Sequence, residues 1–233
     1  MEAGNLRILA IIPARGGSKR IPRKNIRLLH GRPLLEWTAQ FAAEVKGFSR
    51  TVLSTDDPEI LSVGRNCGLD DHGLRPDSLA GDMDSSLDVA LYELDQAAQR
   101  GQCYDAVALL QPTSPYRRKE RWEAAFAYLD EGSAQAVVSV APAPVAPEYY
   151  FRRADDGGLT PLMPEGLRTR SQDVARHYYV NGALYLVRAQ ALRDQRSFFA
   201  SPLKSVVCDD PRESIDLDTE QDWLEAEQLL AAV

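Results

Sequence analysis

The chain has 233 residues and a formal net charge of −7, which suits one large α/β domain and argues against nucleic acid as a partner of the whole molecule. No apolar run approaches the roughly 20 residues of a membrane span, and the first residues lack the basic start of a signal peptide. The three cysteines Cys67, Cys103 and Cys208 are odd in number and widely spaced. We therefore expect a cytoplasmic protein without a membrane segment.

The first strand is predicted at residues 6–12, an apolar run that stops at Pro13 and opens into Gly-Gly-Ser at 16–18. Seven of the eighteen residues in 15–32 are Lys or Arg. Glycine lets successive backbone N–H groups turn toward one anion by adopting positive φ, and Arg and Lys suit phosphate oxygens. We predict a phosphate-binding loop, because an ordinary solvated charge run lacks paired glycines after a strand. The spacing fits neither a P-loop nor a dinucleotide fingerprint.

Helices and strands alternate over the next part of the chain. Apolar residues recur at helical spacing in the segments 33–47, 58–67, 85–98 and 119–130, and short apolar runs predict strands at 51–54, 106–110 and 136–140. A parallel crossover needs a helix, so this alternation favours a mostly parallel sheet with helices on both faces. We predict a Rossmann-like α/β fold in a single domain, residues 1–233.

The pattern breaks at Pro142, after which prolines and paired glycines rule out a continuous helix to about residue 176. We interpret residues of about 142–178 as a hairpin arm that leaves the sheet, with Tyr149, Tyr150 and Phe151 as an apolar hook for a partner surface. The sheet resumes with strands at 183–187 and near 205–208, separated by a short helix at 189–193.

The segment before the C-terminal helix alternates apolar and acidic residues. Period two places Asp216 and Asp218 on one face and buries Ile215 and Leu217 on the other. Paired carboxylates suit a hard cation, and Mg²⁺ is the predicted ion because it also takes water and substrate phosphate oxygens. An alternative makes Asp218 an N-cap with Gln221 completing a capping box, which leaves Asp216 without a role.

Several short motifs occur together in one order. They are Ile12-Pro13-Ala14-Arg15-Gly16-Gly17-Ser18-Lys19 continuing to Lys24-Asn25, Leu53-Ser54-Thr55-Asp56, Arg75-Pro76, residues 82–86, Leu110-Gln111-Pro112-Thr113-Ser114-Pro115-Tyr116-Arg117, Asn181-Gly182-Ala183 and Ile215-Asp216-Leu217-Asp218. Through them the chain resembles, nearly end to end, the acylneuraminate cytidylyltransferases, the CMP-sialic acid synthetase family. The related CMP-Kdo synthetases usually carry Leu-Pro-Gly-Lys where this chain has Ile-Pro-Arg-Lys-Asn. The resemblance implies a fold of the nucleotide-diphospho-sugar transferase type.

The resemblance also implies roles for residues. It places CTP phosphates on Arg15, Gly16, Ser18, Lys19 and Lys24, cytidine by Asn25, Arg75 and Ser85, and Mg²⁺ on Asp216 and Asp218. The anomeric hydroxyl of a nonulosonic acid would attack the α-phosphate and release pyrophosphate, with Arg15, Lys19, Lys24 and Asp218 as catalytic residues. The proton acceptor stays open between an aspartate and a metal-bound hydroxide.

For the acceptor sugar, the resemblance implies contacts from Gln111, Thr113, Ser114 and Asn181, and from Phe198 and Phe199 of the partner in a homodimer joined through the arm. A place in the core is the alternative for the two phenylalanines. The family holds the sugar carboxylate with an arm Lys and with an Arg before Asn-Gly. Here those places carry Glu148-Tyr149 and Ser171, with Arg170 one residue away. Either Arg170 takes over, or the acceptor is another sugar such as legionaminic or pseudaminic acid.

Two alternatives belong to other classes of function. A nonenzymatic nucleotide- or RNA-binding module would spread basic and aromatic residues over one surface, whereas the cations here are confined to one loop. A sugar nucleotidyltransferase using Kdo or another base differs only in its substrates.

Overall fold

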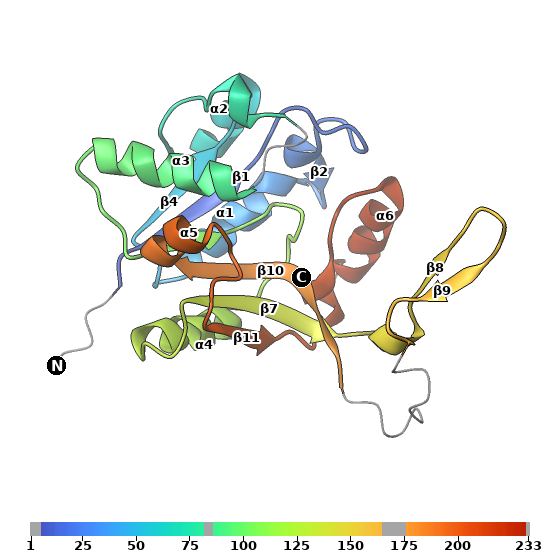
Figure 1. The fold of residues 1–233 in the computed structure, drawn as a ribbon. Helices are drawn as coiled ribbons and strands as arrows, with labels where there is room; N and C mark the ends of the chain where they lie inside the picture. The colour runs from blue at the N-terminus through green and yellow to red at the C-terminus, as the bar shows by residue number, and fades with distance from the viewer. Residues whose placement is uncertain (1–5, 82–85, 165–175, 232–233) are drawn as a thin grey trace.

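The computed structural model describes residues 6–81, 86–164 and 176–231, and Figure 1 shows the chain folded around one central sheet. The sheet has seven strands in the order β11-β7-β10-β6-β1-β4-β5. The strands are β1 (Ile8–Pro13), β4 (Arg50–Ser54), β5 (Asp70–Asp71), β6 (Ala106–Leu109), β7 (Ala136–Pro142), β10 (Tyr178–Arg188) and β11 (Leu203–Val207). All neighbouring pairs are parallel except those of β10, which is antiparallel to β6 and β7. The predicted mostly parallel α/β fold is confirmed.

Helices cover both faces of this sheet (Figure 1). They are α1 (Leu34–Glu44), α2 (Pro58–Asn66), α3 (Ser86–Gln99), α4 (Lys119–Asp130), α5 (Ala189–Gln195) and α6 (Glu220–Leu229). Along β1, Ile8, Ala10 and Ile12 pack with α1, α2 and α4, while Leu9 and Ile11 pack with α3 and α5. A strand buried on both faces reads as a continuous apolar run, which is why β1 was predictable. Helix α6 packs on α1 through a third cluster that includes Trp37 and Trp223.

Two short β-pairs lie outside the central sheet. Strands β2 (Leu28–Leu29) and β3 (Arg32–Pro33) form one, and β8 (Phe151–Arg153) and β9 (Leu159–Pro161) form an antiparallel hairpin. The hairpin projects away from the sheet as the yellow ribbon in Figure 1, so the predicted arm is a hairpin. Tyr149, Tyr150 and Phe151 are exposed there, and their role in dimer formation stays a prediction. Among the described residues, no helix has the length and apolar character needed to cross a membrane.

Residues 215–218 differ from an ordinary strand. They follow the 3-10 turn η6 (Pro211–Ser214) and pair with no neighbouring strand in the described chain. Instead the Leu217 N–H donates to the carbonyl oxygen of Thr113 at 2.9 Å. The predicted alternation nevertheless holds, because Ile215 and Leu217 are buried while Asp216 and Asp218 are not. The Leu217 carbonyl oxygen in turn accepts from Lys24 Nζ at 2.5 Å, so two other parts of the chain hold this segment.

Candidate functional site

A cavity of about 580 Å³ opens where β1 and β6 end. Its wall comprises Pro13, Arg15, Ser18, Lys19, Arg20, Ile21, Lys24, Asn25, Arg75, Leu79, Gly81, Ser86, Val89, Gln111, Pro112, Thr113 and Asp218. The carboxyl ends of parallel strands are where open α/β sheets bind ligands. The cavity combines several cations with one carboxylate and a few apolar side chains, which suits a phosphorylated ligand that also carries a flat ring.

The glycines of the basic loop serve a purpose other than the predicted one. Neither Gly16 nor Gly17 has positive φ, so the expectation of a left-handed glycine backbone was wrong. A Cβ added at Gly16 would lie 2.7 Å from Oδ2 of Asp57, whereas one at Gly17 would meet nothing within 4 Å. Gly16 is therefore required by close approach. The positive φ of this loop falls on Arg23, at 56°.

Arg23 turns away from the cavity. Its guanidinium pairs with the carboxylates of Asp57 and Glu59. Asp57 is also the N-cap of α2, accepting from the backbone N–H groups of Glu59 at 2.8 Å and Ile60 at 3.0 Å. The hydrogen bond from Arg23 lowers the pKa of Asp57 below its usual value, and the two backbone bonds lower it further. This interaction fixes the loop to the start of α2.

Six of the predicted CTP-binding residues do line the cavity: Arg15, Ser18, Lys19, Lys24, Asn25 and Arg75. Asn25 is 5% exposed, and its amide donates to the carbonyl oxygen of Arg15 at 3.0 Å, which holds the loop in place. Ser85 lies outside the described residues. These residues therefore meet in one cavity, although Arg75 is far from the loop in sequence.

Asp56 belongs to one of the family motifs, but the sequence predicted no role for it. Its Oδ1 accepts from the Gly16 N–H at 3.2 Å and from Arg75 Nη2 at 3.3 Å. Arg75 is 5% exposed and also donates to the Ser54 carbonyl oxygen at 3.3 Å. Asp56 thus orients both the loop and a cavity cation. The turn Thr55-Asp56-Asp57-Pro58 directly after a strand was the available signal.

The C-terminal aspartates lie against two different hollows. Asp218 lines the large cavity and lies 3.1 Å from Arg20 Nη1 and 3.3 Å from Lys24 Nζ. Asp216 lines a neighbouring hollow of about 360 Å³ together with Asp222. The pKa of Asp216 is raised above its usual value, chiefly because the surrounding protein removes water from the carboxylate. A hydrogen bond from Thr113 opposes this shift, and the negative charge of Asp218 adds to it. The charge of Asp218 therefore disfavours the ionised form of Asp216.

The alternative capping role for Asp218 is wrong. The N-cap of α6 is Thr219, whose side chain accepts from the Asp222 N–H at 3.2 Å. Asp222 completes the capping box and accepts from the N–H groups of Thr219 at 2.6 Å and Asp218 at 3.0 Å. Because Thr219 takes this position, the Asp218 carboxylate is left facing Lys24 and Arg20.

The donor chemistry of these aspartates fits a hard cation such as Mg²⁺, since each offers carboxylate oxygens beside another negative charge. Within ranges 6–81, 86–164 and 176–231, no three Asp, Glu, His or Cys side chains gather to hold a metal. A Mg²⁺ ion at Asp216 and Asp218 would therefore take its remaining ligands from substrate phosphates and water.

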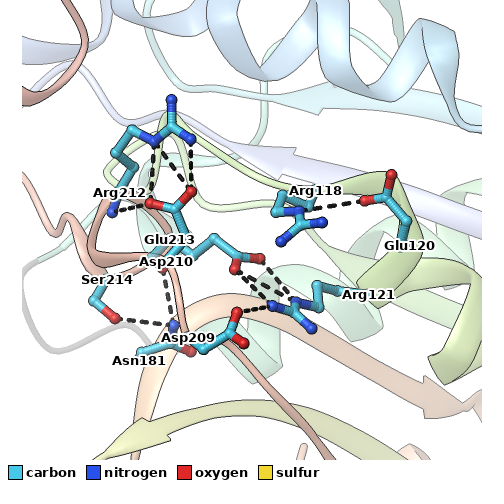
Figure 2. Close-up of polar contacts among 9 residues, drawn as sticks. All are labelled: Arg118, Glu120, Arg121, Asn181, Asp209, Asp210, Arg212, Glu213 and Ser214. Carbon is cyan, nitrogen blue, oxygen red and sulfur yellow. Dashed lines mark hydrogen bonds and ion pairs between the residues drawn. The ribbon is translucent and has the colours of Figure 1, made fainter.

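Figure 2 shows the polar contacts that hold the turn before these aspartates. The Asn181 amide donates to the Glu213 carbonyl oxygen at 2.9 Å and lies 3.4 Å from Ser214 Oγ. The Glu213 side chain is 1% exposed and pairs with Arg121 of α4 at 3.2 Å, while Asp209 contacts the same guanidinium. Asn181 therefore supports the backbone leading to Asp216. It is absent from the wall of the large cavity, so its contact with sugar stays a prediction.

The other predicted sugar-binding residues are divided. Gln111 and Thr113 line the cavity. Ser114 is buried beside Gly182, whose φ is 84°, and a Cβ there would lie 3.4 Å from Ser114 Oγ and 3.8 Å from Gln111 Oε1. Phe198 is buried against Tyr185, so the core alternative holds for it, whereas Phe199 is 49% exposed. Arg170 and Ser171 lie outside the described residues.

Comparison with known proteins places this geometry in context. The cytidylyltransferase family profile matches residues 9–190. The CMP-N,N'-diacetyllegionaminic acid synthase of Legionella pneumophila is 34% identical over 226 residues, which cover 97% of both proteins. The N-acylneuraminate cytidylyltransferase of Escherichia coli O18:K1:H7 is 30% identical over 218 residues, covering 93% of this chain and 50% of that enzyme. A solved CMP:2-keto-3-deoxy-manno-octonic acid synthetase complexed with CTP has a TM-score of 0.68 at 17% identity, covering 97% of this chain and 98% of its own, which shows a shared fold.

Proposed function

The chain belongs to the cytidylyltransferase family and is a nucleotidyltransferase, and from that premise we propose that it transfers the cytidylyl group of CTP to a nonulosonic, sialic-acid-like sugar and releases pyrophosphate. The observation that carries this proposal is the meeting of Arg15, Lys19 and Lys24 with Asp218 in one cavity at the carboxyl ends of β1 and β6. The family match argues against a noncatalytic nucleotide-binding module.

CTP would lie along the wall formed by the basic loop. Arg15, Lys19 and Lys24 would hold and neutralise the phosphate oxygens, with Ser18 adding a hydroxyl. Asn25 keeps the carbonyl of Arg15 fixed, which orients the loop toward the ligand. Cytidine would lie by Arg75, with Leu79 and Val89 as apolar contacts for the ring.

The chemistry consists mainly of positioning and charge neutralisation. The anomeric hydroxyl oxygen of the sugar forms a bond to the α-phosphorus of CTP. The bond between that phosphorus and the oxygen bridging to the β-phosphate breaks, and pyrophosphate leaves with the electron pair. The proton of the sugar hydroxyl has a carboxylate acceptor in Asp218, which lines the same cavity.

Mg²⁺ is proposed as the cofactor, held by Asp216 and Asp218. When bound, it would neutralise phosphate charge that develops as pyrophosphate leaves. Lys24 Nζ lies 3.3 Å from Asp218. Rotation of the Lys24 side chain would let its ammonium group bind phosphate oxygens instead of this carboxylate.

We propose an acceptor of the legionaminic acid type. The Legionella relative that is 34% identical along nearly the whole chain acts, by its name, on a diacetylated member of that class. In the arm, Glu148 lies 3.5 Å from His177 Nε2, at the place where the sialic-acid members carry a Lys.

A homodimer in the cytoplasm is proposed as the working form. The exposed aromatic residues Tyr149, Tyr150 and Phe151 on the arm, together with exposed Tyr178 and Tyr179 at the start of β10, form an apolar surface suited to a second copy of the chain. Light scattering of the purified protein would test this, since a monomer at micromolar concentration contradicts it.

One assay tests the proposed function. Pyrophosphate release is measured with each of four nucleoside triphosphates, with Mg²⁺ or EDTA, and with legionaminic, pseudaminic, N-acetylneuraminic and Kdo acceptors. Release that requires CTP, metal and a nonulosonic acid supports the proposal. Release that requires another base or Kdo moves the chain to a different sugar nucleotidyltransferase, and binding of nucleotide without turnover in every combination contradicts the catalytic assignment.

A further inference from the structure

The buried guanidinium of Arg117 has no role in the site described so far. It lies in the loop between β6 and α4 and is only 7% exposed. Its Nε donates to the Ala183 carbonyl oxygen at 3.0 Å, its Nη2 to the Gln111 carbonyl oxygen at 2.5 Å, and its Nη1 to Thr38 Oγ1 at 3.3 Å. One guanidinium therefore joins the loop after β6 to strand β10 and helix α1.

The charge of Arg117 has no carboxylate beside it. Each hydrogen-bond acceptor it has among the described residues is neutral, and no ion pair joins it to an acid in that part of the chain. The ring of Phe41 lies 5.8 Å from the guanidinium carbon. Burial lowers the pKa of Arg117 to about 9, so the group stays protonated at neutral pH. Burying a cation without a counter-ion is costly, so its retention needs a reason.

The position of Arg117 supplies that reason. Arg117 Nη2 donates to the carbonyl oxygen of Gln111, and Gln111 lines the cavity together with Pro112 and Thr113. The other carbonyl belongs to Ala183, directly after Gly182, where a Cβ would lie 3.8 Å from Gln111 Oε1. Arg117 thus holds the backbone of a residue that lines the cavity, while its own side chain is absent from the lining. A charge in a low-dielectric interior acts over a longer distance than one in water.

We propose that Arg117 is a positioning residue for the acceptor: its fork fixes Gln111 and the segment around Gly182, and its buried positive charge favours an acceptor that carries a carboxylate. The inference rests on the proposed function, because it assigns the Gln111 side of the cavity to the sugar. The carboxylate of the bound acid then provides the counter-charge that the protein itself omits. The CTP side has its own cations in the basic loop, so CTP binding depends less on Arg117.

Two variants of Arg117 and one variant of its neighbour separate the hydrogen bonds of the guanidinium from its positive charge. Arg117→Met removes both, while Arg117→Lys removes the fork and keeps a basic group. Arg118→Met is the matched control, because Arg118 is adjacent in sequence but 41% exposed and paired with Glu120 at 3.5 Å. Circular dichroism and thermal unfolding of each protein establish that it folds. Each is then assayed with the acceptor as its free acid and as its methyl ester.

For the charge, the wild type should prefer the acid to the ester by about tenfold in kcat/KM, and R117M should reduce this ratio to near one. For the fork, R117K should raise the KM of acid and ester alike while the KM of CTP changes less than about twofold. R118M should match the wild type. Equal preference for acid and ester in the wild type, or an unchanged ratio in R117M, overturns the role of the charge. If R117K raises the KM of CTP as much as the KM of the acceptor, the residue is merely structural and the positioning role is overturned.

The two proposals fail separately. Absence of turnover by the wild type with every acceptor contradicts the proposed function. The Arg117 inference is also measured without turnover, by calorimetric titration of the wild type and R117M with the acid and its ester in the presence of CTP and EDTA. If the acid binds no better than the ester to the wild type, the inference is wrong even if the enzyme is active.

Discussion

The ammonium group of Lys24 lies 3.3 Å from Oδ1 of Asp218, although 194 residues separate the two. Lys24 Nζ also donates to the Leu217 carbonyl oxygen at 2.5 Å. The lysine side chain is 13% exposed, and both residues line the large cavity. The basic loop after the first strand and the acidic segment before the last helix therefore meet at the proposed reaction centre.

Replacing either aspartate should slow catalysis strongly and leave the fold intact. Asp216→Asn or Asp218→Asn removes a charge at the proposed metal site, so we expect a loss of about 10²- to 10³-fold in kcat. The capping box of α6 uses Thr219 and Asp222, so thermal unfolding should change little. Glu225→Gln is the control, because Glu225 is an exposed acid near Asp216. Wild-type turnover in both variants would remove the metal proposal.

The two glycines of the basic loop should respond differently to one methyl group. Gly16→Ala places a Cβ 2.7 Å from Asp57 Oδ2, which must shift together with its Arg23 partner. We expect the Kd of CTP to rise about tenfold, since overpacking costs about 1–3 kcal/mol. Gly17→Ala meets no atom within 4 Å and should bind CTP as the wild type does. Equal effects in the two variants, measured by calorimetry, would contradict the close-approach explanation.

The pairing of Arg23 with Asp57 should make stability depend on pH in the acid range. The folded pKa of Asp57 is lowered, chiefly by the hydrogen bond from Arg23. Its stabilisation is thus complete above the ordinary carboxyl pKa and is lost as pH falls through the folded pKa. Asp57→Asn keeps a residue suited to helix capping but loses the charge.

In urea unfolding, Asp57→Asn should be less stable than the wild type by about 1 kcal/mol at pH 7, and the difference should shrink below about pH 4. Glu59→Gln is the control, because Glu59 binds the same arginine but is 68% exposed. A difference that grows as the pH falls would have the wrong sign for this ion pair.

The three cysteines should differ widely in reactivity. Cys103 is exposed, whereas Cys208 is 2% exposed and burial raises its pKa to about 12, helped by the charge of Glu213. Burial also raises the pKa of Cys67. At pH 8, iodoacetamide should label Cys103 first, Cys67 more slowly and Cys208 only after unfolding. Mass spectrometry of tryptic peptides measures this, and labelling of native Cys208 as fast as Cys103 would contradict the packing around η6.

The sequence predicted the elements whose signals are local. The helix at 119–130 coincides with α4, and the alternation of Ile215 and Leu217 with two aspartates predicts their burial correctly. Strand β10 was predicted only at 183–187, although it begins at Tyr178. Its first three residues pair antiparallel with β7, and Asn181-Gly182 lie in the irregularity where the register shifts between Val180 and Tyr185. Asn-Gly usually signals a turn, so the pattern concealed this part of the strand.

The candidate site was predictable in its cations and less so in its supports. The high density of Lys and Arg after the first strand predicted the phosphate-binding loop, and Arg15, Lys19 and Lys24 do line one cavity. The contacts of Asp56 with Gly16 and Arg75, and those of Arg117 with Ala183 and Thr38, join separate segments of the chain. Such contacts depend on which strands become neighbours. The choice of Thr219 over Asp218 as N-cap likewise depends on the direction of the preceding chain.

The fate of the α-phosphate tests the central proposal most directly. The purified chain is incubated with CTP labelled with ³²P at the α-phosphate, Mg²⁺ and legionaminic acid, and in parallel with CTP labelled at the γ-phosphate. We expect the α-label to appear in a CMP-sugar and the γ-label in pyrophosphate, in equal amounts, and Asp218→Asn to form both about 10²- to 10³-fold more slowly. Release of the γ-label as inorganic phosphate, or absence of a labelled sugar with every nonulosonic acid tried, would contradict it.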